Sequence, residues 1–170
     1  MFSPTKDRAF FDRLYQENVE TVRGVLYNMT GRRDLDDLTQ EVFLKVWKNL
    51  PTFAFKSSVK TWVYRISVNV AIDHLRSRPP VSDPVPETLP DEQTAEEISR
   101  RSIQRLIQEA LMVLNENDRA LIVLAYFEDR PLKEIAGILD IPEGTVKSRL
   151  HQARGSLKTE LERRGLHEDL

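Results

Sequence analysis

The chain has 170 residues, of which 40% are hydrophobic and 31% charged, and a formal net charge of −2 at pH 7. This composition provides a core for one domain or two small ones and excludes a wholly disordered chain. It has no cysteine, which excludes disulfides, cysteine-ligated metal centres and thiol nucleophiles. The longest apolar run, Ala120 to Phe127, is far shorter than the ~20 residues that span a bilayer. With no apolar segment typical of a signal peptide at the N-terminus, we expect a soluble cytoplasmic protein.

Apolar residues recur at helical spacing along residues 8–78, and no segment there alternates like a strand. Three helices are expected: one centred on the stripe from Phe11 to Met29, one from Leu35 to Leu50 that ends at Pro51, and one that begins near Ser58. We assign residues 8–78 to a first small helical domain.

Residues 79–98 differ in composition, because they contain several prolines and acidic residues but no lysine or arginine. Proline disfavours both helix and sheet, so this stretch is expected to be an acidic, proline-rich linker. About 20 residues extended at ~3.1 Å each reach ~60 Å, on the order of 18 base pairs of duplex. Outside the linker the chain is net basic, which suits contact with nucleic acid.

Residues 99–164 return to helical spacing and form the expected second domain. An amphipathic helix from Ile103 to Leu114 is followed by Asn115 and Asp118, which have the spacing of a helix N-cap. A short helix from Arg119 to Phe127 comes next, and Pro131 suits the start of another that ends at Leu139. The fold class is therefore all-α, with two small helical domains joined by the linker.

Residues 132–150 have the pattern of a helix-turn-helix. Apolar Ile135, Ile141 and Val146 and small Ala136 stand where such a unit packs its two helices together. The second helix carries donors suited to phosphates and base edges in the major groove. An ordinary helical hairpin with a basic outer face gives the same pattern, and the spacing alone leaves both interpretations open.

The helix that begins near Ser58 carries a polar row spaced by three or four residues, which places the row on one face. Aromatic Trp62 and Tyr64 are interleaved with it. Aromatic and basic side chains together suit unpaired DNA, where rings stack on bases and cations hold the backbone. Taken singly, each of the two aromatics is better explained as a core residue than as a stacking platform. The row consists of Thr61, Arg65, Asn69, Asp73 and Arg76.

Acidic residues gather where the second helix begins, at Asp34, Asp36 and Asp37, with Glu41 one turn later. Acids are favourable at a helix N-terminus, and this is the simpler explanation. A carboxylate metal site or acid catalyst is an alternative, although no histidine lies at ligand spacing. We expect no catalytic residue, no metal, no cofactor and no enzymatic activity.

Two segments together resemble one known family. Residues 34–47 (DLDDLTQEVFLKVW) followed by 59–76 (VKTWVYRISVNVAIDHLR) are similar to region 2 of bacterial sigma factors, and residues 114–150 are similar to region 4. With these two regions and a short linker, the chain resembles the extracytoplasmic-function (ECF) group of the sigma-70 family. The resemblance implies an initiation factor that binds core RNA polymerase and directs it to promoters with −35 and −10 elements.

The resemblance also implies roles for individual residues. Asp37, Gln40, Glu41 and Trp47 would dock on the clamp helices of the largest polymerase subunit. The −10 element would be read and opened by Phe55, Lys56, Lys60, Trp62, Arg65, Asn69 and Arg76. The −35 element would be bound by Thr145, Lys147, Ser148, Arg149, Gln152 and Arg154. An apolar surface near Leu124 and Phe127 would touch the polymerase flap.

The family further implies an anti-sigma factor that holds the protein inactive until a stress signal, in some cases at the membrane, with no membrane insertion by the chain itself. The residues alone leave three other functions open. They are an operator-binding helix-turn-helix regulator that acts as a dimer, a metal-dependent enzyme using the acids near Asp36, and a structural helical adaptor.

Overall fold

The computed structural model describes residues 4–53, 57–77 and 95–166. The described residues form helices and connecting turns, with no strand among them. Within them, too, no helix is both long and apolar enough to cross a membrane. We call residues 4–77 the N-terminal half and residues 95–166 the C-terminal half.

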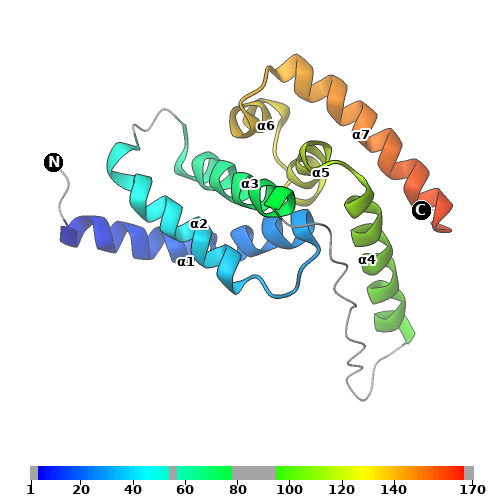
Figure 1. The fold of residues 1–170 in the computed structure, drawn as a ribbon, viewed down its shortest axis with the longest axis horizontal. Coiled ribbons are helices and arrows are strands. Elements are labelled where there is room, and N and C mark those ends of the chain that lie inside the picture. The colour runs from blue at the N-terminus through cyan, green and yellow to red at the C-terminus, as the bar shows by residue number, and fades with distance from the viewer. Residues whose placement is uncertain (1–3, 54–56, 78–94, 167–170) are drawn as a thin grey trace.

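The N-terminal half is a bundle of three long helices: α1 (Pro4–Thr30), α2 (Asp36–Asn49) and α3 (Val59–Ser77) (Figure 1). A short 3₁₀ segment, η1 (Leu50–Thr52), ends α2 at Pro51, as expected from the sequence. The stripes of α1 and α2 face inward, so that Val25, Leu26, Val42 and Val46 are buried. All three helices confirm the expected all-α fold.

The C-terminal half contains α4 (Ala95–Val113), α5 (Glu116–Ile122), α6 (Leu132–Leu139) and α7 (Glu143–Arg163). Helix α4 begins four residues inside the stretch 79–98 that we expected to be linker. No proline follows Pro90 within that stretch, and Glu96 and Glu97 lie in the first turn of α4, where acids stabilise a helix. The rest of that stretch, up to residue 94, lies outside the described residues.

Helix α5 is capped as expected, since the Asn115 side chain accepts a hydrogen bond from the Asp118 amide at 2.9 Å. It does not continue as an α-helix to Phe127 but changes to a π-helical segment, η2 (Val123–Phe127). The Glu128 amide there donates to the Val123 carbonyl, a spacing of five residues, which defines a π turn.

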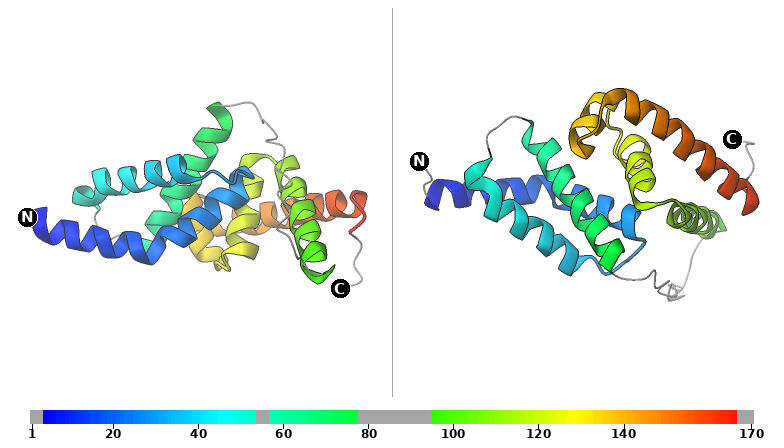
Figure 2. Two further views of the ribbon diagram at one scale, coloured as in Figure 1. Left: turned by 90° about the horizontal axis from the view of Figure 1, so that it is seen from below. Right: turned by 45° about the horizontal axis from the view of Figure 1, so that its top comes forward.

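The two halves share one hydrophobic core. Ile135 and Val146 of the helix-turn-helix belong to the same buried cluster as Val63 and Val68 of α3. Helices α5 and α6 lie against α3, and α4 lies against α1 (Figures 1 and 2). A smaller cluster around Leu111, Ile122 and Ala153 holds α4, α5 and α7 together. The sequence predicted two domains, and the structure packs their helices into one body.

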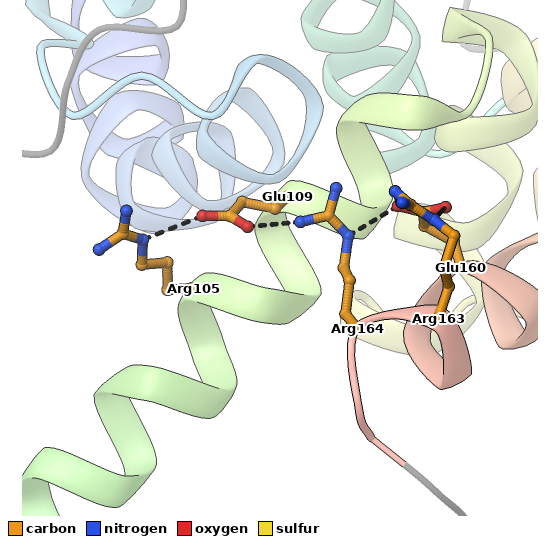
Figure 3. A network of polar contacts seen from close by, with 5 residues as sticks. All are labelled: Arg105, Glu109, Glu160, Arg163 and Arg164. Carbon is orange, nitrogen blue, oxygen red and sulfur yellow. Dashed lines mark hydrogen bonds and ion pairs between the residues drawn. The ribbon is translucent and has the colours of Figure 1, made fainter.

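An ionic network ties α4 to the end of α7 (Figure 3). Glu160 accepts hydrogen bonds from Arg163 at 2.6 Å and Arg164 at 2.7 Å, and Arg164 also bonds Glu109 of α4. Arg105 approaches the other oxygen of Glu109 at 2.9 Å. The two arginines at Glu160 lower the pKa of that carboxyl from its ordinary 4.5 to about 2.

This network predicts a pH dependence of stability. Because the pKa of Glu160 is lower in the folded state, its contribution is present above the ordinary pKa of 4.5 and is lost as the pH falls toward 2. In urea denaturation, the stability difference between the wild type and Glu160→Gln should be constant above pH 5.5 and shrink below it. The double variant Arg163→Ala/Arg164→Ala removes both arginines from Glu160. Its stability should therefore lack the same pH-dependent contribution as that of Glu160→Gln. A difference that grows on acidification would contradict this assignment.

Candidate polymerase and promoter surfaces

One surface lies on α1 and α2, where a groove is lined by Asp37, Gln40, Leu44 and Trp47 of α2 and by Tyr15 of α1. Trp47 is 37% exposed, and its ring packs edge-on against Phe11, with centroids 5.1 Å apart. Leu44, which is 50% exposed, adds a second exposed apolar side chain to this surface. Apolar side chains rimmed by polar ones are typical of protein interaction surfaces.

Of the four residues expected to dock on polymerase, the structure brings Asp37, Gln40 and Trp47 around this groove. Glu41 is exposed on the same helix and pairs with Lys45 at 3.1 Å. Leu44 and Tyr15 were missed. Leu44 could have been found, because it stands four residues after Gln40 and three before Trp47 on one helix face. Tyr15 belongs to a different helix, and no local spacing links it to them.

The acids near the start of α2 do not gather into a metal site. Asp36 instead forms an ion pair with Arg23 of α1 at 2.7 Å. Across residues 4–53, 57–77 and 95–166, no group of three or more histidine, aspartate or glutamate side chains is placed to hold a metal ion.

A second surface, on α3, carries the residues expected to read the −10 element. Lys60 and Asn69 are exposed, and Trp62 is partly buried with its ring stacked on Phe53 at 4.5 Å between centroids. Phe55 and Lys56 lie outside the described residues.

The remaining members of this set are engaged by the C-terminal half. Arg65 donates to the Gly137 carbonyl of α6, and Arg76 pairs with Glu116 of α5 at 2.8 Å. Tyr64, next to Arg65, is buried, in agreement with the core interpretation of that ring.

The helix-turn-helix is formed by α6, a turn and α7. Asp140 ends α6 in the left-handed conformation with φ 55°, which aspartate tolerates better than most residues. Ile135 and Val146 are fully buried, as the motif requires.

A third surface lies along the outer face of α7. Its expected contacts to the −35 element are exposed at Lys147, Ser148, Gln152 and Arg154, and partly buried at Thr145 and Arg149. Arg149 is held by Asp118 at 2.9 Å. The first turns of α7 therefore present amide, hydroxyl and cationic donors along one helix, as a major-groove reader requires.

Of the two residues of the expected apolar contact, Leu124 and Phe127, only one is exposed. Leu124 is fully buried in the shared core, whereas Phe127 is 41% exposed and its neighbour Tyr126 is 55% exposed. The whole run from Ala120 to Phe127 is apolar, so that periodicity gives no indication of which side chains face outward.

The described residues combine a three-helix unit that carries an exposed, partly apolar groove with a helix-turn-helix. Comparison with known proteins identifies the family that has this arrangement. Residues 14–79 match the model of Sigma-70 region 2, and residues 104–157 match that of Sigma-70, region 4. The chain belongs to the ECF group of the sigma-70 family and is a transcription initiation factor.

Individual relatives span nearly the whole chain. The ECF RNA polymerase sigma-E factor of Haemophilus influenzae is 31% identical over 92% of this chain and 89% of its own length. The ECF sigma factor SigW of Bacillus subtilis is 30% identical over 88% of this chain and 83% of its own length.

Among solved structures, CnrH in complex with the cytosolic domain of CnrY superimposes with a TM-score of 0.70, 22% identity, and coverage of 91% of this chain and 89% of that one. The sigma factor RpoE of Bartonella quintana, in complex with the anti-sigma factor NepR, gives a TM-score of 0.66, 22% identity, and coverage of 89% and 96%. Both solved structures superimpose over the N-terminal and the C-terminal half, so the similarity in fold covers both halves.

Proposed function

We propose that this ECF sigma factor binds core RNA polymerase through the α2 groove and directs it to promoters that carry −35 and −10 elements. The observation that supports this most directly is the grouping of Asp37, Gln40 and Trp47 around one exposed, partly apolar groove. A groove of this kind suits a helical partner that offers both apolar and polar side chains. The polymerase performs the chemistry.

In this proposal, α3 reads and opens the −10 element. The exposed Asn69 amide offers a donor and an acceptor to a base edge, and Lys60 adds a cation on the exposed surface of the same helix. Trp62, stacked on Phe53, helps to hold the separated strands. Phe55 and Lys56 precede this helix in the chain and complete the proposed set.

The exposed face of α7 enters the major groove at the −35 element, with Arg149 as its central contact. We assign the contact with the polymerase flap to Tyr126 and Phe127, which are exposed, and not to the buried Leu124.

The two functional regions in this proposal are residues 8–78 and 99–164, joined by residues 79–98. They act in the cytoplasm together with the polymerase.

Regulation by an anti-sigma factor is part of the proposal. Two structural relatives were solved in complex with a partner, the cytosolic domain of CnrY and the anti-sigma factor NepR. We propose that this chain is likewise held inactive by an anti-sigma factor until a stress signal releases it.

Reversing the charge of Glu41 tests the polymerase surface. Glu41→Lys should weaken binding to core polymerase at least ~10-fold by placing a cation in a contact that selects an acid, and should cost only about 0.5 kcal/mol of folding stability. Binding is measured by fluorescence anisotropy of labelled protein titrated with core enzyme, and stability by urea denaturation.

Glu162→Lys is the matched control. Glu162 pairs with Lys158 at 3.9 Å, four residues apart on α7, as Glu41 pairs with Lys45 on α2. Both variants therefore reverse an exposed acid that pairs with a lysine one helical turn away, with the order of acid and lysine opposite in the two pairs, but only Glu41 belongs to the proposed surface. Equal affinity of the two variants for core enzyme would count against the α2 surface.

A further inference from the structure

A pocket separate from the α2 groove lies between the N-terminal part of α1 and the start of α3. Its volume is about 380 Å³, which is within the range of small-ligand sites. The residues that line it include Phe10, Arg13, Glu17 and Asn18 of α1 and Lys60 of α3. Phe11 and Tyr15 of α1 line the α2 groove instead, so the two sites use different faces of one helix.

We propose that this pocket binds one unpaired base of the promoter strands that α3 separates, and that this base carries an exocyclic amino group. The inference rests on the proposed function of α3. It extends the promoter surface to α1, to which the proposed function assigns no contact with DNA. Lys60 connects the two surfaces, because it lines the pocket and also belongs to the set proposed for the −10 element.

The Asn18 side chain is the main evidence for a ligand. Asn18 is only 8% exposed, and its amide nitrogen donates to the Leu14 carbonyl at 2.8 Å. The amide oxygen accepts no hydrogen bond from the described part of the chain, although the side chain lines the pocket. An acceptor that is largely buried and has no donor is unfavourable. The pocket therefore suits a ligand that brings an N–H group to this oxygen.

The other lining groups suit a nucleotide. The Arg13 guanidinium lies over the Phe10 ring, 5.9 Å from its centre, and both aromatic rings and guanidinium planes stack on bases. Arg13, Glu17 and Lys60 are exposed, and among the described residues none of the three forms an ion pair. The two cations are therefore available to the phosphates on either side of a bound base.

The acceptors in the pocket select the kind of base. The Asn18 amide oxygen and the Glu17 carboxylate both accept hydrogen bonds. Adenine, cytosine and guanine each carry an exocyclic amino group that donates to such acceptors, whereas thymine has none. We therefore expect the pocket to bind a base with an amino group and to disfavour thymine.

Removal of single bases tests the pocket. The probe is a promoter from which the wild-type protein initiates with core polymerase, prepared with a single-stranded −10 region in which one base at a time is replaced by an abasic site. With the wild-type holoenzyme, one such site should weaken binding at least ~5-fold, the size expected for loss of a stacked base. Because this base contacts α1, the same loss should persist in Asn69→Ala.

The double variant Phe10→Leu/Arg13→Ala removes the ring and the guanidinium but keeps an apolar side chain at residue 10. In this variant the same abasic site should change affinity by less than about twofold, because the variant and the missing base remove one interaction. Its affinity for core enzyme should stay within about twofold of the wild type, since the pocket and the α2 groove are separate.

Arg33→Ala is the matched control for charge. Arg33 is exposed just after the other end of α1, roughly 25 Å along the helix from Arg13, and belongs to none of the proposed surfaces. This variant should keep the full sensitivity to the abasic site. Equal sensitivity in the wild type, Arg33→Ala and Phe10→Leu/Arg13→Ala at every position would overturn the proposal.

Base preference at the position so identified tests the acceptors. With the wild type, thymine there should bind at least ~3-fold more weakly than adenine or cytosine, about the size of one hydrogen bond. Glu17→Gln adds donors to the pocket and should reduce this difference. A preference for thymine in the wild type would overturn the proposal. A wild-type holoenzyme that bound no single-stranded −10 DNA at all would refute the proposed function of α3, and this inference with it.

Discussion

Replacing Arg119 with alanine is expected to lower the free energy of unfolding by at least about 3 kcal/mol, at or above the upper end of the range usual for a single substitution. The side chain is only 6% exposed. Its guanidinium donates to the carbonyls of Leu111, Met112 and Leu114 at 2.9–3.0 Å and to that of Met29 at 2.6 Å.

The size of this effect follows from the acceptors that would be left behind. The first three carbonyls belong to the end of α4 or the turn after it, where helical carbonyls lack most of their intrahelical donors; of the three, that of Leu111 also accepts from the Leu114 amide at 3.1 Å. Met29 lies at the end of α1, so that the same side chain also joins the two halves. Hydrogen bonds to a charged donor contribute about 1.5–3 kcal/mol each, and a buried carbonyl without a donor adds a further penalty.

Urea denaturation followed by circular dichroism measures this loss. Arg105→Ala is the control, because Arg105 is exposed and pairs with Glu109 on the same helix, and it should change stability by no more than about 0.5 kcal/mol. Arg119→Lys keeps the charge but not the planar fork of donors, and should fall between the two. A loss below about 1 kcal/mol for Arg119→Ala would refute the central role of this side chain.

Arg149→Ala should weaken recognition of the −35 element by about 1–3 kcal/mol, roughly 5- to 150-fold, while core binding is retained. Asp118 holds the guanidinium at 2.9 Å and is itself fixed by Asn115 at 2.6 Å. Because the Arg149 side chain is already held in place, it loses less conformational entropy when it forms a bidentate contact to a base.

Transcription from promoters with every single substitution in the −35 element separates a base contact from a phosphate contact. Loss of preference at one position marks a base contact, whereas uniform weakening marks a phosphate contact. Arg163→Ala removes the same charge from the other end of α7 and should leave the base preference intact. If the two variants behaved alike, Arg149 would have no special role at the −35 element.

Much of the fold could be predicted because its helices carry clear local signals. The stripe of α2 ends at Pro51 and the cap of α5 uses Asn115 and Asp118, both as the sequence indicated. These features depend on residues within one or two turns of each other. Local spacing was therefore sufficient to place them.

The packing of the halves could not be predicted in this way. Ile135 and Val146 were expected to hold the helix-turn-helix together, and they do so while also joining the core around Val63. An apolar stripe shows that a helix face is buried but not against which helix. Because we expected two domains separated by a linker, we did not predict the contact between Arg65 and Gly137.

The candidate site was assigned from the family resemblance, and local spacing accounts for only part of its geometry. Asp37, Gln40 and Trp47 lie on one helix and line one groove. Tyr15, from another helix, was missed. The resemblance pointed to the region of Leu124 and Phe127, and the sequence could not show that Leu124 is buried, because it lies in a wholly apolar run that ends in a π turn, where α-helical spacing does not apply.

The measurement that tests the central claim most directly is transcription by purified bacterial core RNA polymerase across a promoter library, with and without this protein, with start sites read by sequencing. The account predicts initiation that depends on the protein and comes from one class of promoters with shared −35 and −10 sequences. A folded protein, free of inhibitor, that neither binds core enzyme nor supports initiation would contradict it and would favour an operator-binding regulator.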